Sequence, residues 1–90
     1  LKALQTQTPD LILLDIHMPG MSGLEVLAAA RQSTSKGEMP ILMVTADSNP
    51  DSVVQAFGLG ANDYVTKPID SRTLGARIDT HLQLSAATKQ

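Results

Sequence analysis

The stretch "LILLDIHMPGMSGLEVL", Leu11 to Leu27, determines how the rest of the chain is interpreted. Its continuous apolar run, Leu11–Leu14, predicts a short strand that is buried on both faces. The run stops at Asp15, and a turn rich in proline and glycine leads into a helix expected over Ser22–Ser33. Taken alone, an aspartate such as Asp15 before a Pro-Gly turn is more often a turn former or helix cap than a metal ligand or a nucleophile. Only the rest of the sequence distinguishes these roles.

Two further apolar runs predict two further strands. The first is "PILMVTA", Pro40–Ala46, which has the same continuous character and is expected to be buried. The second is Asp63–Thr66, within the segment "NDYVTKP". Before the first strand, Leu1–Gln7 has the pattern of the tail of a helix. The glycines of the turn after Asp15 are best explained by turn geometry, since they do not form a phosphate-binding fingerprint.

Helical patterns separate and follow these strands. Asn49 is a favourable N-cap and Pro50 suits the first helical position, so a helix is expected to begin there. Asp70 is expected to cap the last helix. Its apolar residues recur every fourth position and predict one buried stripe, made of Leu74, Ile78 and Leu82.

The alternation of strand and helix predicts an α/β fold with a parallel sheet and right-handed crossovers. In such sheets ligands bind at the carboxyl ends of the strands. The first strand ends at Asp15, the second at Thr45, and the third leads into Lys67. We therefore expect a carboxylate, a hydroxyl and an amine to meet at one edge of the sheet.

This combination of groups suits phosphoryl transfer. A carboxylate can attack phosphorus and form an acyl phosphate. The reaction requires positive charge and hydrogen-bond donors near the incoming phosphoryl group, which Lys67 and Thr45 would supply. A divalent metal usually contributes as well, and Asp15 offers one of the oxygen ligands that Mg²⁺ prefers.

The composition argues against several other classes of protein. The chain has 90 residues, a net charge of −2 and seven scattered Lys and Arg residues, so no basic surface for nucleic acid is expected. It contains no cysteine, which excludes disulfides and thiolate metal sites and fits a reducing compartment. No apolar stretch has transmembrane length and no secretion signal begins the chain, so we expect a cytoplasmic protein with no membrane contact. His17 and His81 have no partner at ligand spacing, and a zinc site is not expected.

Three separated segments, "LILLDIHMPGMSGLEVL", "PILMVTA" and "GANDYVTKP", together resemble the receiver domain of bacterial two-component response regulators. The resemblance covers essentially the whole chain. It implies that Asp15 is the phospho-accepting aspartate and that the hydroxyl of Thr45 senses the phosphoryl group. It also implies that Ala46 contributes a backbone N–H and that Lys67 contacts the phosphoryl group.

The resemblance extends to a switch and a metal site. Tyr64 occupies the position of an aromatic switch that changes rotamer as Thr45 moves, although a plain core position is an equal alternative. Lys67-Pro68 matches a peptide bond that is cis in this family. The backbone carbonyl of His17 and the carboxylate of Asp15 match ligands of Mg²⁺.

Receiver domains have the flavodoxin-like strand order 2-1-3-4-5, and the strands expected here correspond to the third, fourth and fifth. Residues 1–90 are thus interpreted as a partial receiver domain without the first two strands, the first helix and their acidic pair. Because that pair contributes most of the affinity for Mg²⁺ in this family, we expect metal binding to be weakened or lost. Residues 83–90 are interpreted as the start of a linker to an output domain.

The implied function is that of a phospho-accepting module in a two-component phosphorelay, not of an enzyme. Its expected partners are a histidine kinase or phosphotransfer protein and an output domain or effector. An exposed edge on the strand Leu11–Leu14 would also favour a homodimer or a strand-exchanged oligomer.

Two alternatives remain open. One is a degenerate receiver that acts only as a non-phosphorylated interaction module. The other is a phosphohydrolase of the haloacid-dehalogenase type, which also uses an aspartate nucleophile at a strand end. That family places a second aspartate two residues later, where this chain has His17.

Overall fold

The computed structural model describes residues 11–89, and within them the predicted α/β fold with a parallel sheet is confirmed. The sheet has the strand order β1-β4-β5 and all its neighbours are parallel. Its strands are β1 (Ile12–Leu14), β4 (Ile41–Thr45) and β5 (Asp63–Thr66). The helices are α1 (Gly23–Arg31), α2 (Pro50–Leu59) and α3 (Ser71–Lys89). The helix tail expected over Leu1–Gln7 lies outside the described residues.

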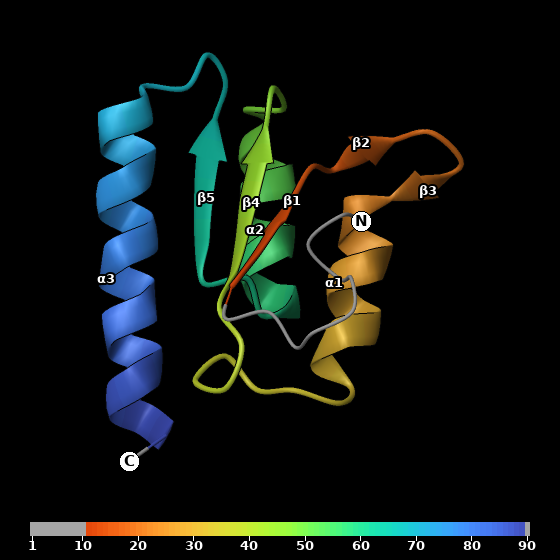
Figure 1. The fold of residues 1–90 in the computed structure, drawn as a ribbon. Coiled ribbons are helices and arrows are strands. Elements are labelled where there is room, and N and C mark those ends of the chain that lie inside the picture. Colours follow the sequence, from red (N-terminus) through yellow and green to blue (C-terminus); the bar gives the residue numbers. More distant parts are fainter. Residues whose placement is uncertain (1–10, 90) are drawn as a thin grey trace.

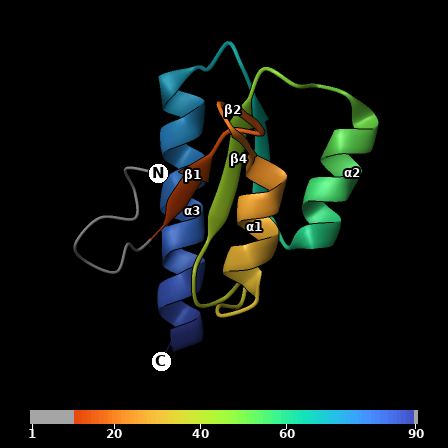
Figure 2. The same cartoon turned by 90° about the vertical axis from the view of Figure 1, so that its right-hand side faces the viewer.

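The helices form two layers around the sheet. Helices α1 and α2 lie side by side on one face, and α3 covers the other, as Figures 1 and 2 show from two directions. The main core fills the space between the sheet and the α1–α2 layer, and Tyr64 packs against this core. Its buried members are Ile12, Leu14, Ile16, Leu27, Met39, Ile41, Met43, Ala56 and Ala61. The alternate residues of β4, Leu42 and Val44, are buried on the α3 side.

The two strands predicted to be fully buried differ in their surroundings. All five residues of β4 are buried, as expected for a central strand covered on both faces. In β1, Ile12 and Leu14 are buried but Leu13 is 41% exposed. The prediction of burial on both faces is therefore wrong for β1. Within the described residues, β1 lies at an edge of the sheet and pairs with β4 alone.

The predicted helix ends are largely confirmed. The side chain of Asn49 accepts a hydrogen bond from the N–H of Asp51 at 2.9 Å, and Pro50 is the first residue of α2. Asp70 accepts from the N–H of Arg72 at 2.9 Å and so caps α3. The stripe of Leu74, Ile78 and Leu82 is half-buried, which agrees with a helix packed by one face. Helix α1 is shorter than expected because it ends at Arg31.

Arg31 joins several elements at the ends that lie lowest in Figure 1, a role that the sequence did not indicate. Its Nε donates to the carbonyl of Gly60 at 2.8 Å, and its Nη2 donates to Oδ1 of Asn62 at 2.6 Å. Its Nη1 donates to the carbonyl of Met39 at 2.8 Å. The guanidinium thereby ties the end of α1 to the loop before β4, the end of α2 and the start of β5. Burial lowers the pKa of Arg31.

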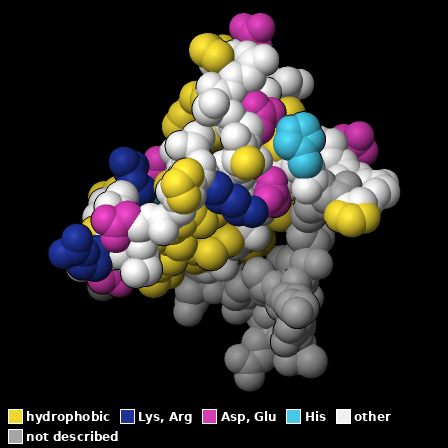
Figure 3. All heavy atoms as spheres, turned by 90° about the horizontal axis from the view of Figure 1, so that it is seen from above, with side chains coloured by type: hydrophobic (Ala, Val, Ile, Leu, Met, Phe, Trp, Pro, Cys, Tyr) yellow, Lys and Arg dark blue, Asp and Glu magenta, His cyan; other side chains and the backbone are white. Residues whose placement is uncertain are grey.

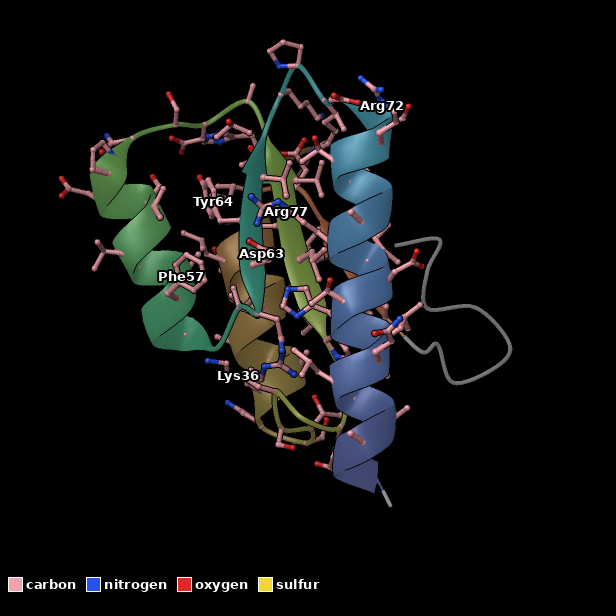
Figure 4. The ribbon with its side chains drawn as sticks, turned by 90° about the vertical axis from the view of Figure 1, so that its left-hand side faces the viewer. Lys36, Phe57, Asp63, Tyr64, Arg72 and Arg77 are labelled. Atoms are coloured by element: carbon pink, nitrogen blue, oxygen red, sulfur yellow. The ribbon has the colours of Figure 1, made fainter. Side chains whose placement is uncertain are left out.

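A charged cluster attaches α3 to β5. Asp63, near the start of β5, accepts hydrogen bonds from Arg77 at 3.0 and 3.1 Å, and its Oδ2 lies 3.1 Å from Nε2 of His81. Arg77 and His81 are four residues apart and so share one face of α3. Figure 4 shows Arg77 reaching from α3 toward Asp63 on β5. His81 is therefore paired with a carboxylate of the sheet.

Candidate functional site

The three groups predicted to converge are brought together at the carboxyl end of the sheet. Nζ of Lys67 donates to Oδ2 of Asp15 at 2.9 Å, although the two residues are 52 positions apart in the chain. Thr45, the last residue of β4, is fully buried, and its hydroxyl helps to lower the pKa of Asp15. The side chain of Asp15 is 30% exposed, so its carboxylate remains open to solvent on one side.

The environment of Asp15 keeps its carboxylate ionised. Burial raises the pKa of Asp15, but hydrogen bonds from Lys67, Thr45 and the backbone N–H of His17 lower it by more. The N–H of His17 donates to Oδ1 of Asp15 at 3.2 Å. The net pKa lies below the ordinary value of an aspartate, and the group is an anion with an available lone pair at neutral pH.

The position of Asp15 depends on a close contact with the start of α1. The N–H of Gly23 donates to the carbonyl of Ile16 at 2.7 Å. A Cβ atom on Gly23 would lie 1.9 Å from the backbone oxygen of Asp15, so only glycine permits this approach. Turn geometry explains Gly20, whose φ is +77°. Gly23 has a different role, because it lets the start of α1 lie directly against the backbone of Asp15.

The turn after Asp15 forms a small hairpin that the sequence did not predict. Strand β2 (His17–Met18) pairs antiparallel with β3 (Met21–Ser22). Ser22 ends this hairpin and also caps α1 by accepting from the N–H of Leu24. The hairpin projects from the upper part of the molecule in Figure 1. It carries His17 beyond the end of the sheet.

Lys67 is oriented by the end of β5. Its N–H donates to the carbonyl of Thr45 at 2.8 Å, which continues the β4–β5 pairing in which Thr45 faces Thr66. The Lys67-Pro68 peptide bond is cis, as the resemblance implied. Ala46 follows Thr45 directly after β4 and is exposed.

Asp47 is a residue of this site that the sequence reasoning missed. Nε2 of His17 lies 3.2 Å from Oδ2 of Asp47, and the hydroxyl of Ser52 donates to the same oxygen at 3.0 Å. His17, like His81, is thus partnered by a carboxylate. The sequence held a signal for this contact. His17 comes two positions after Asp15, and Asp47 comes two positions after Thr45. Parallel neighbouring strands bring such equal offsets together.

Tyr64 has one face in the core and its hydroxyl at the site. The hydroxyl donates to the backbone carbonyl of Asp47. Burial raises the pKa of Tyr64, and the negative charges of Asp47 and Asp15 raise it further, so the phenol remains a hydrogen-bond donor. Figure 4 shows Tyr64 on β5 on the side nearer α2. The core and the switch interpretations of Tyr64 are therefore compatible with a single position.

The oxygen groups predicted for Mg²⁺ are the carboxylate of Asp15 and the carbonyl of His17. Between residues 11 and 89, no group of three or more His, Cys, Asp or Glu side chains is arranged to hold a metal ion. Mg²⁺ requires a nearly octahedral set of oxygen ligands, and this carboxylate is already engaged by Lys67 and His17. The carboxylate of Asp15 and the carbonyl of His17 would supply only part of such a set of oxygen ligands.

Seen from the end where the strands finish, a basic side chain, acidic side chains and a histidine gather within a small area (Figure 3). The chemistry available there is that of a partly exposed carboxylate flanked by an ammonium group and a buried hydroxyl. Such a site can accept an electrophilic group on the carboxylate and stabilise new negative charge around it.

Residues 1–79 match the family model of the response regulator receiver domain. Among solved structures, the chain is similar to the BeF3-activated receiver domain of DrrB, an OmpR/PhoB homologue of Thermotoga maritima, with 31% identity and a TM-score of 0.78. It is also similar to a CheY-like receiver domain protein from Methanospirillum hungatei, with 28% identity and a TM-score of 0.83. A third similar structure is NtrX from Brucella abortus in complex with ATP, with 27% identity and a TM-score of 0.83.

These likenesses cover most of this chain but only part of its relatives. The matches to the DrrB domain, the Methanospirillum protein and NtrX cover 86%, 96% and 98% of this chain. They span 64%, 67% and 20% of the respective relatives. None of the helices described for this chain is long and apolar enough to cross a membrane.

Proposed function

This chain belongs to the response regulator receiver domain family, and we propose that it accepts a phosphoryl group on the carboxylate of Asp15. The observation that carries the proposal is the contact of 2.9 Å between Nζ of Lys67 and Oδ2 of Asp15, beside the buried hydroxyl of Thr45. Receiver domains are in general phosphoacceptors and not enzymes, and we propose no catalytic activity for this chain beyond loss of its own phosphoryl group.

The proposed reaction is a simple displacement at phosphorus. An oxygen of the Asp15 carboxylate forms the new P–O bond while the P–N bond of a phosphohistidine donor breaks. The histidine ring of the donor leaves and takes up a proton to become neutral imidazole. The ammonium of Lys67 balances the negative charge of the carboxylate now and would balance that of the phosphoryl oxygens afterwards.

The same geometry supports a switch. The hydroxyl of Thr45, which acts on the carboxylate of Asp15, and the backbone N–H of Ala46 are the donors that we propose turn toward the phosphoryl oxygens. Thr45 also accepts a hydrogen bond from the N–H of Asp47, at 3.2 Å, and the carbonyl of Asp47 receives the hydroxyl of Tyr64. A movement of Thr45 is thus expected to change the environment of Tyr64.

Receiver domains typically bind Mg²⁺, and the described part of this chain is poor in ligands for it. Asp15 and the carbonyl of His17 are the groups that we propose contact the ion. Because one carboxylate supplies few of the oxygen ligands that Mg²⁺ needs, we expect the binding of Mg²⁺ to be weak.

The partners that we propose are those of a two-component phosphorelay in the cytoplasm. A histidine kinase or a phosphotransfer protein would supply the phosphoryl group, and an output domain or effector would read the result. Helix α3 continues through residue 89, so residues 83–90 are proposed as the start of a helical connection to an output domain, within a receiver unit over residues 1–90.

The decisive experiment treats the chain with a small phosphodonor and Mg²⁺ and measures its intact mass. We expect a mass increase of one phosphoryl group that the substitution Asp15→Asn abolishes. Asp79→Asn is the matched control, because Asp79 is an exposed carboxylate on α3 outside the site, and it should leave the adduct unchanged.

The absence of an adduct from the unsubstituted chain, or its survival in Asp15→Asn, would contradict the proposal. The first result would favour an interaction module that works without phosphorylation. Release of free phosphate from a range of phosphomonoesters would instead favour the phosphohydrolase, although His17 stands where that family has an aspartate.

A further inference from the structure

Two loops at the carboxyl edge of the sheet are tied together by side chains. One loop follows β1 and carries His17, and the other follows β4 and carries Asp47. The His17 Nε2 to Asp47 Oδ2 distance of 3.2 Å joins residues 30 positions apart in the chain. An aspartate carboxylate at neutral pH offers only acceptor oxygens for hydrogen bonds. The imidazole of His17 is therefore the donor.

The contacts close a ring around the phosphoacceptor. The N–H of His17 donates to Asp15, the imidazole of His17 donates to Asp47, and the N–H of Asp47 donates to Thr45. The hydroxyl of Thr45 in turn acts on the carboxylate of Asp15, whose pKa it lowers. Asp15 thus reaches Asp47 by two separate paths. One path runs through Thr45 in the sheet, and the other runs through His17 outside it.

Asp47 is also connected outward. Its Oδ1 accepts from the N–H of Asn49 at 2.9 Å, and its Oδ2 accepts from the hydroxyl of Ser52 in the first turn of α2. Its backbone carbonyl accepts from the hydroxyl of Tyr64 on β5. One residue therefore contacts the loop after Asp15, the start of α2 and the tyrosine of β5.

We infer that His17 is a positioning residue for the switch, which acts through Asp47 to link the phosphoacceptor loop to Tyr64 and α2. This inference rests on the proposed function, since the signal that it transmits is the modification of Asp15. The path through His17 couples Asp15 to Tyr64 in addition to the path through Thr45. The path is contiguous, because every step in it is a hydrogen bond between described residues.

The exposure of His17 makes the inference testable. The side chain of His17 is 75% exposed and that of Asp47 is 16% exposed. Surface pairs of this kind contribute little to stability, so removing the imidazole should not unfold the chain. A loss of coupling in a folded variant then separates positioning from a general structural role.

Tyr64 provides a reporter that no other residue can obscure. It is the single tyrosine of the chain, which has no tryptophan. Its fluorescence depends on the hydrogen bond of its hydroxyl, which at present goes to the carbonyl of Asp47. The experiment measures the change in tyrosine fluorescence on adding beryllofluoride with Mg²⁺, while ¹⁹F NMR gives the fraction bound.

At equal fractions bound, we expect His17→Ala to reduce the amplitude of the tyrosine signal roughly twofold or more, as removal of one residue of a coupled network can do. His17→Gln keeps an N–H donor and should restore much of the amplitude. Asp79→Asn is the control, because it changes an exposed side chain on α3 outside the site. An unchanged amplitude in His17→Ala would overturn the inference.

A second measurement does not depend on phosphorylation. In the absence of any phosphoryl mimic, hydrogen exchange at the amides of residues 47–49 should be faster in His17→Ala and near the wild-type rate in His17→Gln. If the wild-type chain binds no beryllofluoride, the proposed function fails while this measurement still decides the link. Exchange unaffected by His17→Ala would then reject the link itself.

Discussion

At the scale of the residue, the site combines a reactive group with neighbours that hold its charge. Asp15 has the exposure that a phosphoacceptor requires, while Thr45 is fully buried and fixed at the end of β4. A carboxylate held by nearby side chains also occurs at Asp63, which is only 15% exposed and lies beside Arg77 and His81 of α3. The second cluster serves the fold, because it attaches α3 to the sheet.

Asp63 should make the stability of the chain depend on pH. Burial raises its pKa, but the hydrogen bonds from Arg77, the N–H of Tyr64 and His81 lower it by more, so the net pKa is below the ordinary value. The stabilisation is then complete above about pH 4, the pKa of an unfolded aspartate. It is lost as the pH falls through the lower pKa of the folded state. Asp63→Asn should cost about 1–3 kcal/mol at pH 7.

Urea unfolding at pH 7, 4 and 3 measures this effect. The unfolding free energy of the wild-type chain should fall more steeply with acid than that of Asp63→Asn. Asp79→Asn, which alters an exposed carboxylate, should keep the wild-type slope. Parallel slopes for wild type and Asp63→Asn would show that the pKa of Asp63 is not lowered in the folded state.

At the scale of the element, the ends of α2 show how local and tertiary effects combine. Asn49 and Pro50 begin the helix by capping and by a fixed backbone angle, which are local properties of the sequence. Gly60 ends it with a φ of +109°, which glycine adopts without strain. The same glycine also lies against Arg31, and that contact depends on how α1 and α2 pack.

Two glycines only two residues apart should therefore respond in opposite ways to alanine. Gly58 is inside α2 with no atom near an added Cβ, so Gly58→Ala should stabilise the chain by about 0.5–1 kcal/mol. At Gly60 an added Cβ would lie 2.9 Å from Cγ of Arg31 and would strain the backbone. Gly60→Ala should cost about 2 kcal/mol or more.

Thermal unfolding of the two variants beside the wild-type chain tests this pair. A rise in Tm for Gly58→Ala and a fall for Gly60→Ala are expected. Equal shifts for both would mean that the anchoring of Arg31 to the end of α2 is not as rigid as its hydrogen bonds indicate.

At the scale of the whole molecule, the sheet has an apolar edge. In the part of the chain that the structure describes, β1 pairs on one side alone, and Leu13 is 41% exposed on it. Edge strands with apolar side chains recruit other strands. We therefore expect this chain to associate with a second copy through β1, as a homodimer or a strand-exchanged oligomer.

Light scattering after size-exclusion chromatography, over a range of concentrations, measures that association. Leu13→Lys should shift the chain toward a monomer, because a lysine on an edge strand disfavours pairing. Val54→Lys is the control, since Val54 is an equally apolar and more exposed residue, 72%, on α2. A wild-type chain that stays monomeric at every concentration would contradict the expectation.

Sequence and structure agree most closely where each residue is governed by its neighbours in the chain. The limits of β5 and the N-cap of α2 were predicted from local patterns. The convergence of Asp15, Thr45 and Lys67 was predicted because strand ends in a parallel sheet share one edge. The exposure of Leu13 was not, because it depends on which elements cover each face.

The sequence by itself determined the order of the three sheet strands and the helices, the N-terminal caps of α2 and α3, and the chemistry that reaches the carboxyl edge. These follow from hydrophobic periodicity and from the backbone preferences of a few residues, which act over a few positions of the chain. The tertiary structure alone decided that His17 bonds to Asp47, that Asp63 lies between Arg77 and His81, and that Arg31 joins the lower ends of the elements. These contacts join residues 8 to 31 positions apart, and only the path of the loops and the packing of the helices brings such partners together.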